Sequence, residues 1–251
     1  YAAGKAQTAR NDHVENAMGD LGNIVEATEE LVQPVVIPAE AYISPEYALA
    51  ERDRLWRKTW LQAGRIEDIP NEGDFITYEI GDDSVIIVRG EGAEVRAFHN
   101  VCPHRGRKLV DVPPGQRNAR GTKRSFVCGF HGWTFGLDGR NSYIAEEQDW
   151  QGALAGGCAD LGTVNVGTWG GWLWINLDPD CMPLADYLEP AASMLEPYRL
   201  QDMRARWRKW VVFDCNRKVA MEAFCETYHV ATRHPEFNAF AQFRGWARNR
   251  G

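Results

Sequence analysis

The sequence predicts an α+β fold, with an antiparallel β domain over residues 40–180 and the beginning of a second, mixed domain over residues 181–251. Two observations predict this order. Between residues 74 and 177, short runs of β-branched and aromatic residues alternate with glycine-rich turns, which is the pattern of antiparallel strands. After Asp178-Pro179, segments with helical spacing surround one strand-like segment, which is typical of a mixed α+β domain.

The composition is that of a soluble globular protein. Of the 251 residues, 44% are hydrophobic and 25% are charged. The formal net charge of −7 argues against a nucleic-acid binder, which needs a concentrated basic surface. No apolar run is long enough to span a membrane, and no signal peptide is visible. The six cysteines do not form a disulfide framework, which predicts a reducing, cytoplasmic setting.

Local signals predict the elements that flank and build the β domain. Residues 1–39 form a polar N-terminal arm with an amphipathic stretch over residues 12–31. Ser44-Pro45 opens a helix that runs to about Trp60, since proline suits the first helical position. The predicted strands are Phe75–Glu79, Ser84–Arg89, Val95–Asn100, Ser125–Val127, Trp133–Gly136 and Gly171–Leu177. The predicted later elements are a helix over Leu184–Tyr198, a strand over Arg204–Phe213 and a helix over Val219–Val230.

Two short loops carry a cysteine and a histidine each. The first reads Cys102-Pro-His104, and the second reads Cys128-Gly-Phe-His131. A [2Fe–2S] cluster with two histidines on one iron needs two such pairs on two tight, glycine-containing loops. Zinc is the rival metal, but its ligand pairs usually space two cysteines by two to four residues, which Cys102 and His104 do not match. The four residues are therefore predicted to bind the cluster.

The loops resemble those of Rieske proteins, and the resemblance covers the whole β domain. Rieske proteins of respiratory complexes carry an extra cysteine in each loop, and these two cysteines form a disulfide. Arg107 and Phe130 occupy the corresponding positions here. The chain therefore resembles the low-potential branch of ring-hydroxylating oxygenases and Rieske ferredoxins. The segment 105–127 between the two pairs is long, and its inserted part is predicted to be a surface elaboration.

A second group of potential metal ligands lies near the end of the sequence. At helical spacing, Glu222, Glu226 and His229 share one face. His229 and His234 can face one metal only if the helix distorts or ends between them, which Pro235 favours. Two histidines and a carboxylate form the triad that binds Fe(II) and leaves positions open for O₂. Taken alone, the segment also fits an amphipathic helix with ordinary surface histidines.

This segment resembles the Asn-x-Lys … carboxylate-x-Tyr-His-x₄-His motif of Rieske non-heme iron oxygenase α-subunits. The resemblance implies that His229 and His234 bind the mononuclear iron. It implies that Glu226 is the bridging carboxylate, which in the family hydrogen-bonds an iron-ligating histidine and a cluster-ligating histidine of the neighbouring subunit. Those two histidines would be His229 and His131 here. The second domain would then be the N-terminal part of a helix-grip (START-like) catalytic domain.

Three departures from the family motif bear on this interpretation. The bridging position is more often aspartate than glutamate, and Arg217 stands where the family usually has tryptophan. The third, carboxylate ligand of the iron lies far downstream in the family, beyond Gly251, so it is not expected in this chain. Glu222 is a conceivable substitute, but the motif gives no support for it.

The resemblance implies a terminal oxygenase component that uses the cluster and Fe(II) to activate O₂. It would mono- or dihydroxylate, or demethylate, an organic substrate, and aromatic substrates are the commonest in the family. A ferredoxin, a flavin reductase or both would deliver electrons from NAD(P)H, and a homotrimer, with or without a β-subunit, is expected. Two alternatives remain at this stage: a stand-alone Rieske-type electron-transfer protein and a non-catalytic Rieske protein that binds a ligand.

One basic set is not part of either motif. Arg204, Arg206, Arg208 and Lys209 alternate along the strand predicted over residues 204–213. Such a set usually marks a solvated face, and the alternative is a surface that receives an acidic electron donor.

Overall fold

The computed structural model describes residues 37–154, 159–226 and 229–237. The amphipathic stretch predicted over residues 12–31 lies outside the described residues. The chain divides into two compact units, one formed by Pro45–Asp214 and the other by Tyr1–Ser44 together with Cys215–Gly251. The domain boundaries predicted at residues 40, 180 and 181 remain predictions, whereas the predicted α+β fold class is confirmed.

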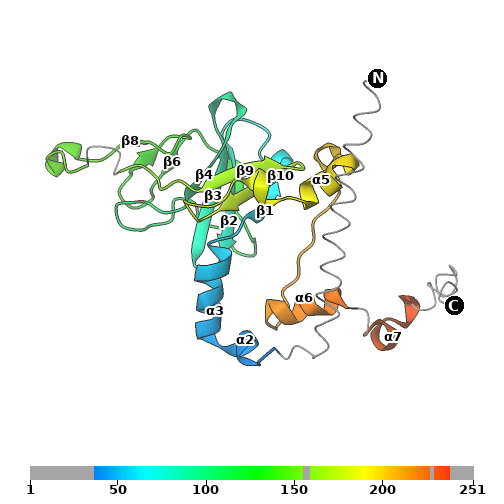
Figure 1. The fold of residues 1–251 in the computed structure, drawn as a ribbon. Helices are drawn as coiled ribbons and strands as arrows, with labels where there is room; N and C mark the ends of the chain where they lie inside the picture. Colours follow the sequence, from blue (N-terminus) through cyan, green and yellow to red (C-terminus); the bar gives the residue numbers. More distant parts are fainter. Residues whose placement is uncertain (1–36, 155–158, 227–228, 238–251) are drawn as a thin grey trace, which may run out of the picture. The chain divides into compact units, whose positions relative to one another are not determined.

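The larger unit contains three antiparallel sheets in its described part (Figure 1). One has the order β4-β3-β2-β5, built from Val95–His99, Asp83–Arg89, Asp74–Ile80 and Arg120–Thr122. The second has the order β1-β10-β9, built from Leu61–Arg65, Trp172–Asn176 and Asn165–Trp169. The third has the order β6-β7-β8, built from Phe126–Val127, Thr134–Phe135 and Asn141–Tyr143.

The hairpin between β2 and β3 shows how the sequence sets the register. Ile80 pairs with Asp83, so the turn contains only Gly81 and Asp82. Two-residue hairpins need a positive φ, and Gly81 supplies it with φ +55°. From this turn, the pairing continues to Phe75 opposite Val88 without a register shift.

Strand β3 separates two hydrophobic cores. Val85, Ile86, Ile87 and Val88 are all fully buried, because side chains on a strand point alternately to opposite faces. Ile86 and Val88 pack in the core that contains the two motif cysteines, and Val85 and Ile87 pack in the other. The second core also holds residues of β1 and β10. The sheet around β3 therefore holds the cysteine loops on one side and the β1-β10-β9 sheet on the other.

All six predicted strands are present, within two residues at each end. Sequence reasoning missed β1, β5, β8 and β9. Strand β5 lies in the long segment between the two ligand loops, where its Arg-Gly-Thr sequence is exposed and pairs at the sheet edge with β2. A run so short and polar carries no alternation signal, and its pairing with β2 decides its structure.

The structure corrects several predicted helices and one strand. The helix predicted to reach Trp60 comprises α3 (Pro45–Glu51) and the π-helix η1 (Arg52–Trp56). The helix predicted over 184–198 is broken, because Pro190 and Pro197 lack the backbone N–H that a continuous helix needs. Its pieces are α4 (Leu184–Tyr187), α5 (Ala191–Leu195) and η6 (Glu196–Tyr198). The strand predicted over 204–213 is wrong, since this segment pairs with no strand of the described residues.

The smaller unit contains α2 (Glu40–Ile43), α6 (Arg217–Cys225) and α7 (Val230–Arg233) in its described part. The remaining 3₁₀ turns, all in the larger unit, are η2 (Ile66–Asp68), η3 (Glu91–Ala93), η4 (Glu147–Trp150) and η7 (Leu200–Asp202). Among the helices of the described residues, none combines the length and the apolar character that crossing a membrane requires.

Gly139 offers a test of the core that holds the cysteines. A Cβ atom there would lie 2.3 Å from Cε1 of the buried Phe98, and φ is +80°. We expect Gly139→Ala to lower the free energy of unfolding by about 3 kcal/mol, the sum of left-handed strain of about 1–2 kcal/mol and overpacking of about 1–3 kcal/mol. Urea denaturation followed by circular dichroism measures this. Gly92→Ala is the control, because Gly92 has φ +68° but open space around it, and equal losses in the two variants would contradict the packing argument.

Candidate functional site

The two cysteine loops have the same turn geometry. In the first, Cys102 N–H donates to the Arg107 carbonyl at 2.8 Å and Gly106 N–H donates to the Cys102 carbonyl at 2.9 Å. In the second, Cys128 N–H donates to the Trp133 carbonyl at 2.8 Å, and the Gly132 N–H donates to the Cys128 carbonyl at 3.0 Å. The glycine four residues after each cysteine has φ +72°, which explains why glycine stands there.

The turns bring the four predicted ligands together. The rings of His104 and His131 are 4.6 Å apart between centroids. Cys102 and Cys128 are 2% and 3% exposed. Burial is the main cause that raises the pKa of the Cys102 thiol, and the hydrogen-bonded Cys128 thiol raises it further. The two sulfurs and the two imidazoles therefore converge from two loops.

Two observations fit these residues to a Rieske cluster. Nδ1 of His131 is buried and has no hydrogen-bond partner among the described residues, which is costly for a nitrogen that binds nothing. Burial lowers the pKa of His104, and the charges of His131 and Arg105 lower it further, which favours the neutral imidazole that a metal ligand must be. Within the described residues, no group of three or more His, Cys, Asp or Glu is placed to hold one metal ion. This agrees with a Rieske cluster, in which the protein provides only two ligands to each iron.

Two tryptophans surround the ring of His104. Trp133 is 3% exposed and stacks on His104 with a centroid distance of 4.9 Å and an interplanar angle of 9°. Trp150 meets His104 edge-on at 5.6 Å and Trp133 at 5.7 Å. These contacts restrict the ring and limit the water around it, and solvent exposure is one of the factors that set the potential of an iron–sulfur cluster.

Asn100 holds the first loop in place, and sequence reasoning missed it. Its side chain is 1% exposed, and its Nδ2 donates to the Val110 carbonyl at 2.7 Å and to Ser84 Oγ at 3.0 Å. Its Oδ1 accepts from the N–H groups of Leu109 and Val110 at 3.1 and 3.0 Å. Asn100 precedes the loop that carries Cys102, and Leu109 and Val110 follow it. The Asn100 amide thus joins the two ends of this loop. The only sequence signal is a polar residue at the end of an apolar strand, two positions before the cysteine.

The second candidate site lies in the smaller unit, where His229 and His234 flank α7. Their ring centroids are 5.4 Å apart. Nδ1 of His229 hydrogen-bonds with Oε1 of Glu226, and the His229 N–H donates to Oε2 of the same carboxylate at 3.2 Å. Nδ1 of His234 lies 3.5 Å from Oε1 of Glu236. Each histidine thus turns Nδ1 to a carboxylate, which leaves Nε2 as the nitrogen for a metal.

One expectation about this site is wrong. Glu222, Glu226 and His229 do not share one helical face, because α6 ends at Cys225 and Glu226 is extended, with φ −138° and ψ 162°. The carboxylate of Glu222 accepts a 2.6 Å hydrogen bond from the hydroxyl of Tyr42 instead. The expected end of the helix near Pro235 is confirmed, since His234 is the C-cap of α7.

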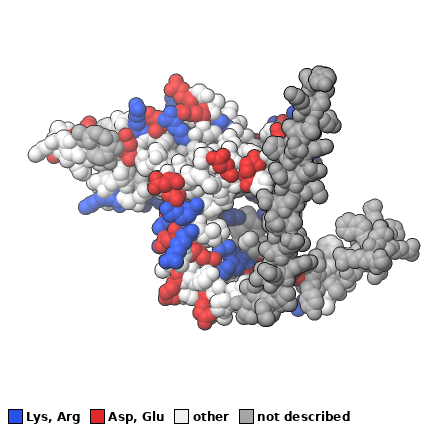
Figure 2. Space-filling model, viewed as in Figure 1, with Lys and Arg blue, Asp and Glu red and all other residues white. Residues whose placement is uncertain are grey.

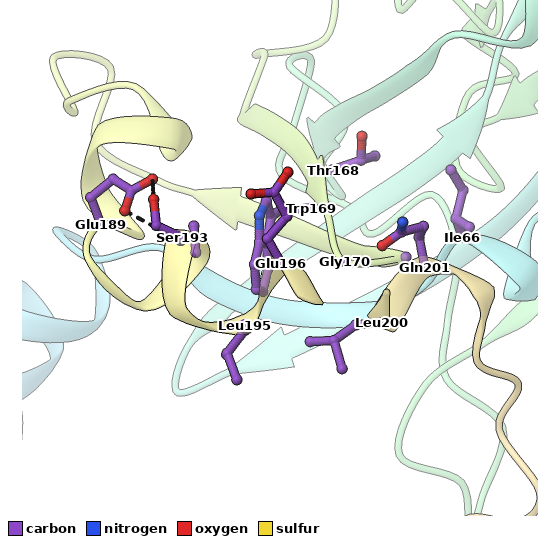
Figure 3. Close-up of a pocket in the computed structure, with 12 residues that line it drawn as sticks. Ile66, Thr168, Trp169, Gly170, Glu189, Ser193, Leu195, Glu196, Leu200 and Gln201 are labelled. Atoms are coloured by element: carbon purple, nitrogen blue, oxygen red, sulfur yellow. Dashed lines mark hydrogen bonds between the residues drawn. The ribbon is translucent and has the colours of Figure 1, made fainter. Parts of the chain in front are cut away.

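A hollow of about 630 Å³ beneath the β9–β10 turn belongs to neither ligand group (Figure 3). It is lined by Trp169, Glu189 and Glu196, among others. The dashed lines mark hydrogen bonds between Glu189 and Ser193 of α5. The Glu189 carboxylate accepts from the hydroxyl of Ser193 at 3.0 Å and from its N–H at 3.3 Å. No histidine or cysteine is among the described residues that line this hollow.

Comparison with known families matches both parts of the chain. A model described as the Rieske [2Fe-2S] domain matches residues 59–151. A model described as the ring hydroxylating alpha subunit (catalytic domain) matches residues 198–247. The chain belongs to the Rieske oxygenase α-subunit family. The first match contains all four residues of the cysteine loops, and the second contains His229 and His234.

Several characterised members of the Rieske oxygenase family are similar to the chain. The glycine betaine monooxygenase oxygenase subunit of Chromohalobacter salexigens is 32% identical over 80% of this chain and 43% of its own length. The biphenyl 2,3-dioxygenase subunit alpha of Rhodococcus jostii is 31% identical over 86% and 46%. The solved structure of the quaternary ammonium Rieske monooxygenase CntA with L-carnitine has a TM-score of 0.71 and 26% identity, covering 80% of this chain and 56% of that one. The chain thus spans about half the length of the curated relatives it matches.

Asn100→Leu tests the hydrogen bonds that hold the first cysteine loop. Leucine leaves the Leu109 and Val110 N–H groups without their acceptor, and each unsatisfied buried group costs about 1–3 kcal/mol. We expect the variant to be less stable by about 3 kcal/mol or more and to purify with less iron and acid-labile sulfide than the wild type. Iron and sulfide assays and visible circular dichroism measure the cluster.

Asn176→Leu is the matched control, since Asn176 is also 1% exposed but lies in β10, away from the cysteine loops. We expect it to lose stability and keep its iron and sulfide. If both variants lost the cluster equally, Asn100 would have no particular role in the loop.

Proposed function

We propose that the chain is part of the terminal oxygenase component of a Rieske non-heme iron oxygenase, which hydroxylates or demethylates an organic substrate. The single observation that carries the proposal is the presence of two ligand groups in one chain of this family. One group comprises Cys102, His104, Cys128 and His131. The other is the Glu226, His229 and His234 arrangement. A stand-alone electron carrier would have no use for the second group.

We propose that the four loop residues bind the [2Fe–2S] cluster and that His229 and His234 bind the mononuclear iron through Nε2. When bound, the cluster supplies single electrons, and the iron supplies coordination positions for O₂. Glu226 holds the His229 ring by its Nδ1, which fixes the tautomer and makes Nε2 a better metal ligand. We propose that the third iron ligand is a carboxylate other than Glu222, because the Glu222 carboxylate is hydrogen-bonded to Tyr42. This ligand is proposed to lie outside the described residues.

The partners, which follow from the family, and the domain boundaries, which follow from the sequence pattern, are part of the proposal. We propose a Rieske domain over residues 40–180 and the start of the catalytic domain over residues 181–251. A ferredoxin or a flavin reductase would deliver electrons, and the subunits would form a trimer in which Glu226 faces His131 of a neighbouring copy. The contact between Glu226 and His229 supports one half of such a bridge.

For the substrate class, we propose quaternary ammonium compounds first. The glycine betaine and carnitine enzymes among the relatives act on such compounds, and CntA has a TM-score of 0.71 over 80% of this chain. Naphthalene 1,2-dioxygenase reaches 0.55 over 62%. An aromatic substrate is the second candidate, because the biphenyl 2,3-dioxygenase subunit matches 86% of this chain.

The iron content tests the oxygenase proposal. We expect about three irons per chain in the loaded wild-type protein, and about two in His229→Ala and His234→Ala, because the cluster alone holds two. Both variants should keep the visible spectrum of the cluster and lose substrate-dependent oxygen uptake. Thr232→Ala, on the same short helix, is the control and should keep three. A wild-type protein with about two irons whose electron transfer is unaffected by His229→Ala would instead be an electron carrier.

The role of Glu226 has a separate test. Glu226→Gln keeps the size of the side chain but removes the charge that supports the His229 ring, and we expect a loss of about 10–100-fold in iron affinity or turnover. The cluster spectrum should not change. Iron retention during dialysis and product formation per minute measure the two effects.

Glu222→Gln is the matched control for Glu226, because it removes a carboxylate of the same unit that is bonded to Tyr42 rather than to a histidine. We expect it to retain iron and turnover. The reverse result, with iron lost in Glu222→Gln and kept in Glu226→Gln, would make Glu222 the metal ligand.

A further inference from the structure

A cleft of about 570 Å³ lies on the larger unit, and none of the residues of the two ligand groups is among the described residues that line it. Its walls come from β1, β2, β5 and β10, from the inserted segment before β5, and from the extended segment after Met203. The volume is within the range of about 300–1,000 Å³ that small-molecule sites occupy. We call it the cationic cleft, and it is defined by Gln62, Tyr78, Arg117, Arg120, Trp172, Arg208, Lys209 and Trp210.

The charges in the cationic cleft are unequal. Four of its described lining residues are cationic, and Glu79 alone among them carries a carboxylate. That carboxylate is already used, because it accepts from Lys108 at 2.7 Å and from Ser84 at 2.6 Å. On the face of the molecule drawn in Figure 2, cationic and anionic side chains are interspersed instead. The cleft therefore offers an excess of positive charge in a concave site.

Arg120 and Arg208 come from distant parts of the sequence and are brought together by Asp68. Arg120 Nη1 and Arg208 Nη2 each lie 3.7 Å from an oxygen of this carboxylate. Their side chains remain 59% and 50% exposed, so their other N–H groups are open to a ligand. Arg117 lies near the phenol of Tyr78, whose pKa is raised by burial and lowered by the charge of Arg117. Three guanidinium groups thus face one space, and guanidinium groups bind carboxylates and phosphates well.

Two tryptophans add flat apolar walls. Trp172 packs against the buried Arg65, whose guanidinium carbon lies 5.0 Å from the centroid of the Trp172 ring. Arg65 Nη2 also donates to the Met203 carbonyl at 2.6 Å, which fastens the start of the extended segment to the sheet. This segment then presents Trp210 to the same cleft. A planar group can contact such aromatic walls, and the arginines supply the charge.

We propose that the cationic cleft binds a planar organic anion, in which a ring carries a phosphate or a carboxylate group. An acidic electron-donor protein fits less well, because the cleft is built on the core of Leu61, Ile76 and Leu173 rather than on the core that contains Cys102 and Cys128. A donor seated there would be on the side of the sheet away from the cysteines. The proposal does not depend on the proposed oxygenase function.

Isothermal titration calorimetry on the cluster-loaded full chain tests the proposal. The probes are adenosine 5′-diphosphate and benzoate, with the uncharged adenosine and benzamide as their partners and inorganic pyrophosphate as the anion without a ring. We expect at least one ring-bearing anion to bind about tenfold or more tightly than its uncharged partner, because charged hydrogen bonds contribute most of the selectivity. Added salt should weaken the binding. Binding of the diphosphate alone or of benzoate alone identifies the phosphate or the carboxylate as the preferred group.

The variants locate the binding in the cleft. Arg208→Gln and Arg117→Gln should each weaken the ring-bearing anion by about tenfold. Trp210→Ala should weaken the ring-bearing anion and leave pyrophosphate unchanged. Arg140→Gln is the control, since Arg140 is 82% exposed and lies outside the cleft. Every variant is first shown to keep the cluster spectrum and thermal unfolding midpoint of the wild type.

Three results would overturn the proposal. The first is that neither adenosine 5′-diphosphate nor benzoate gives binding heat at millimolar concentration. The second is equal affinity for the charged and the uncharged probes, or for pyrophosphate and the diphosphate. The third is unchanged affinity in both arginine variants, which would place the anion elsewhere.

Discussion

The constraint on which the β domain depends is that two cysteines are buried in a core while the backbone around them keeps its hydrogen bonds. A buried N–H or carbonyl without a partner is costly. Each cysteine solves this locally, because its own N–H and carbonyl close a tight turn on a glycine with φ +72°. After the first turn, the side-chain amide of Asn100 hydrogen-bonds three backbone groups, which are the Leu109 N–H and the N–H and carbonyl of Val110. The backbone of both loops is thus held by hydrogen bonds within the protein itself, and such support favours a well-defined metal site.

The two ligand groups use different physical means. In the cysteine loops, burial and neighbouring charge lower the pKa of His104, and the buried Nδ1 of His131 has no hydrogen-bond partner among the described residues. At His229 and His234, carboxylates on Nδ1 orient rings at the ends of a single short helix. The first arrangement suits a cluster that exchanges electrons inside a protein core. The second suits an iron that needs open positions, because the carboxylates orient the rings without occupying the nitrogen that would bind the metal.

The segment from Met203 to Phe213 shows how one stretch can belong to two parts of the molecule. It falls within the match to the catalytic domain, yet it contacts the β domain through Arg65 and Glu67. Its basic residues were interpreted from sequence as a solvated strand face or a surface for an acidic donor. In the structure, Arg208 and Lys209 instead line a concave space with Arg117 and Arg120. That space is the site for which we propose a planar organic anion.

The sequence by itself determined the family and the six main strands, and it predicts the four loop residues as cluster ligands. It could do so because each Cys-His pair lies within one tight turn, and because alternation along a strand is a local property. Only the tertiary structure decided the role of Asn100, the pairing of β5 with β2, and the end of α6 before Glu226. The first two depend on partners in other segments of the chain, since Asn100 bonds to Ser84 and Val110 and β5 pairs with β2. The cationic cleft is the clearest case, since Asp68 brings together Arg120 and Arg208, whose spacing in the sequence carries no signal.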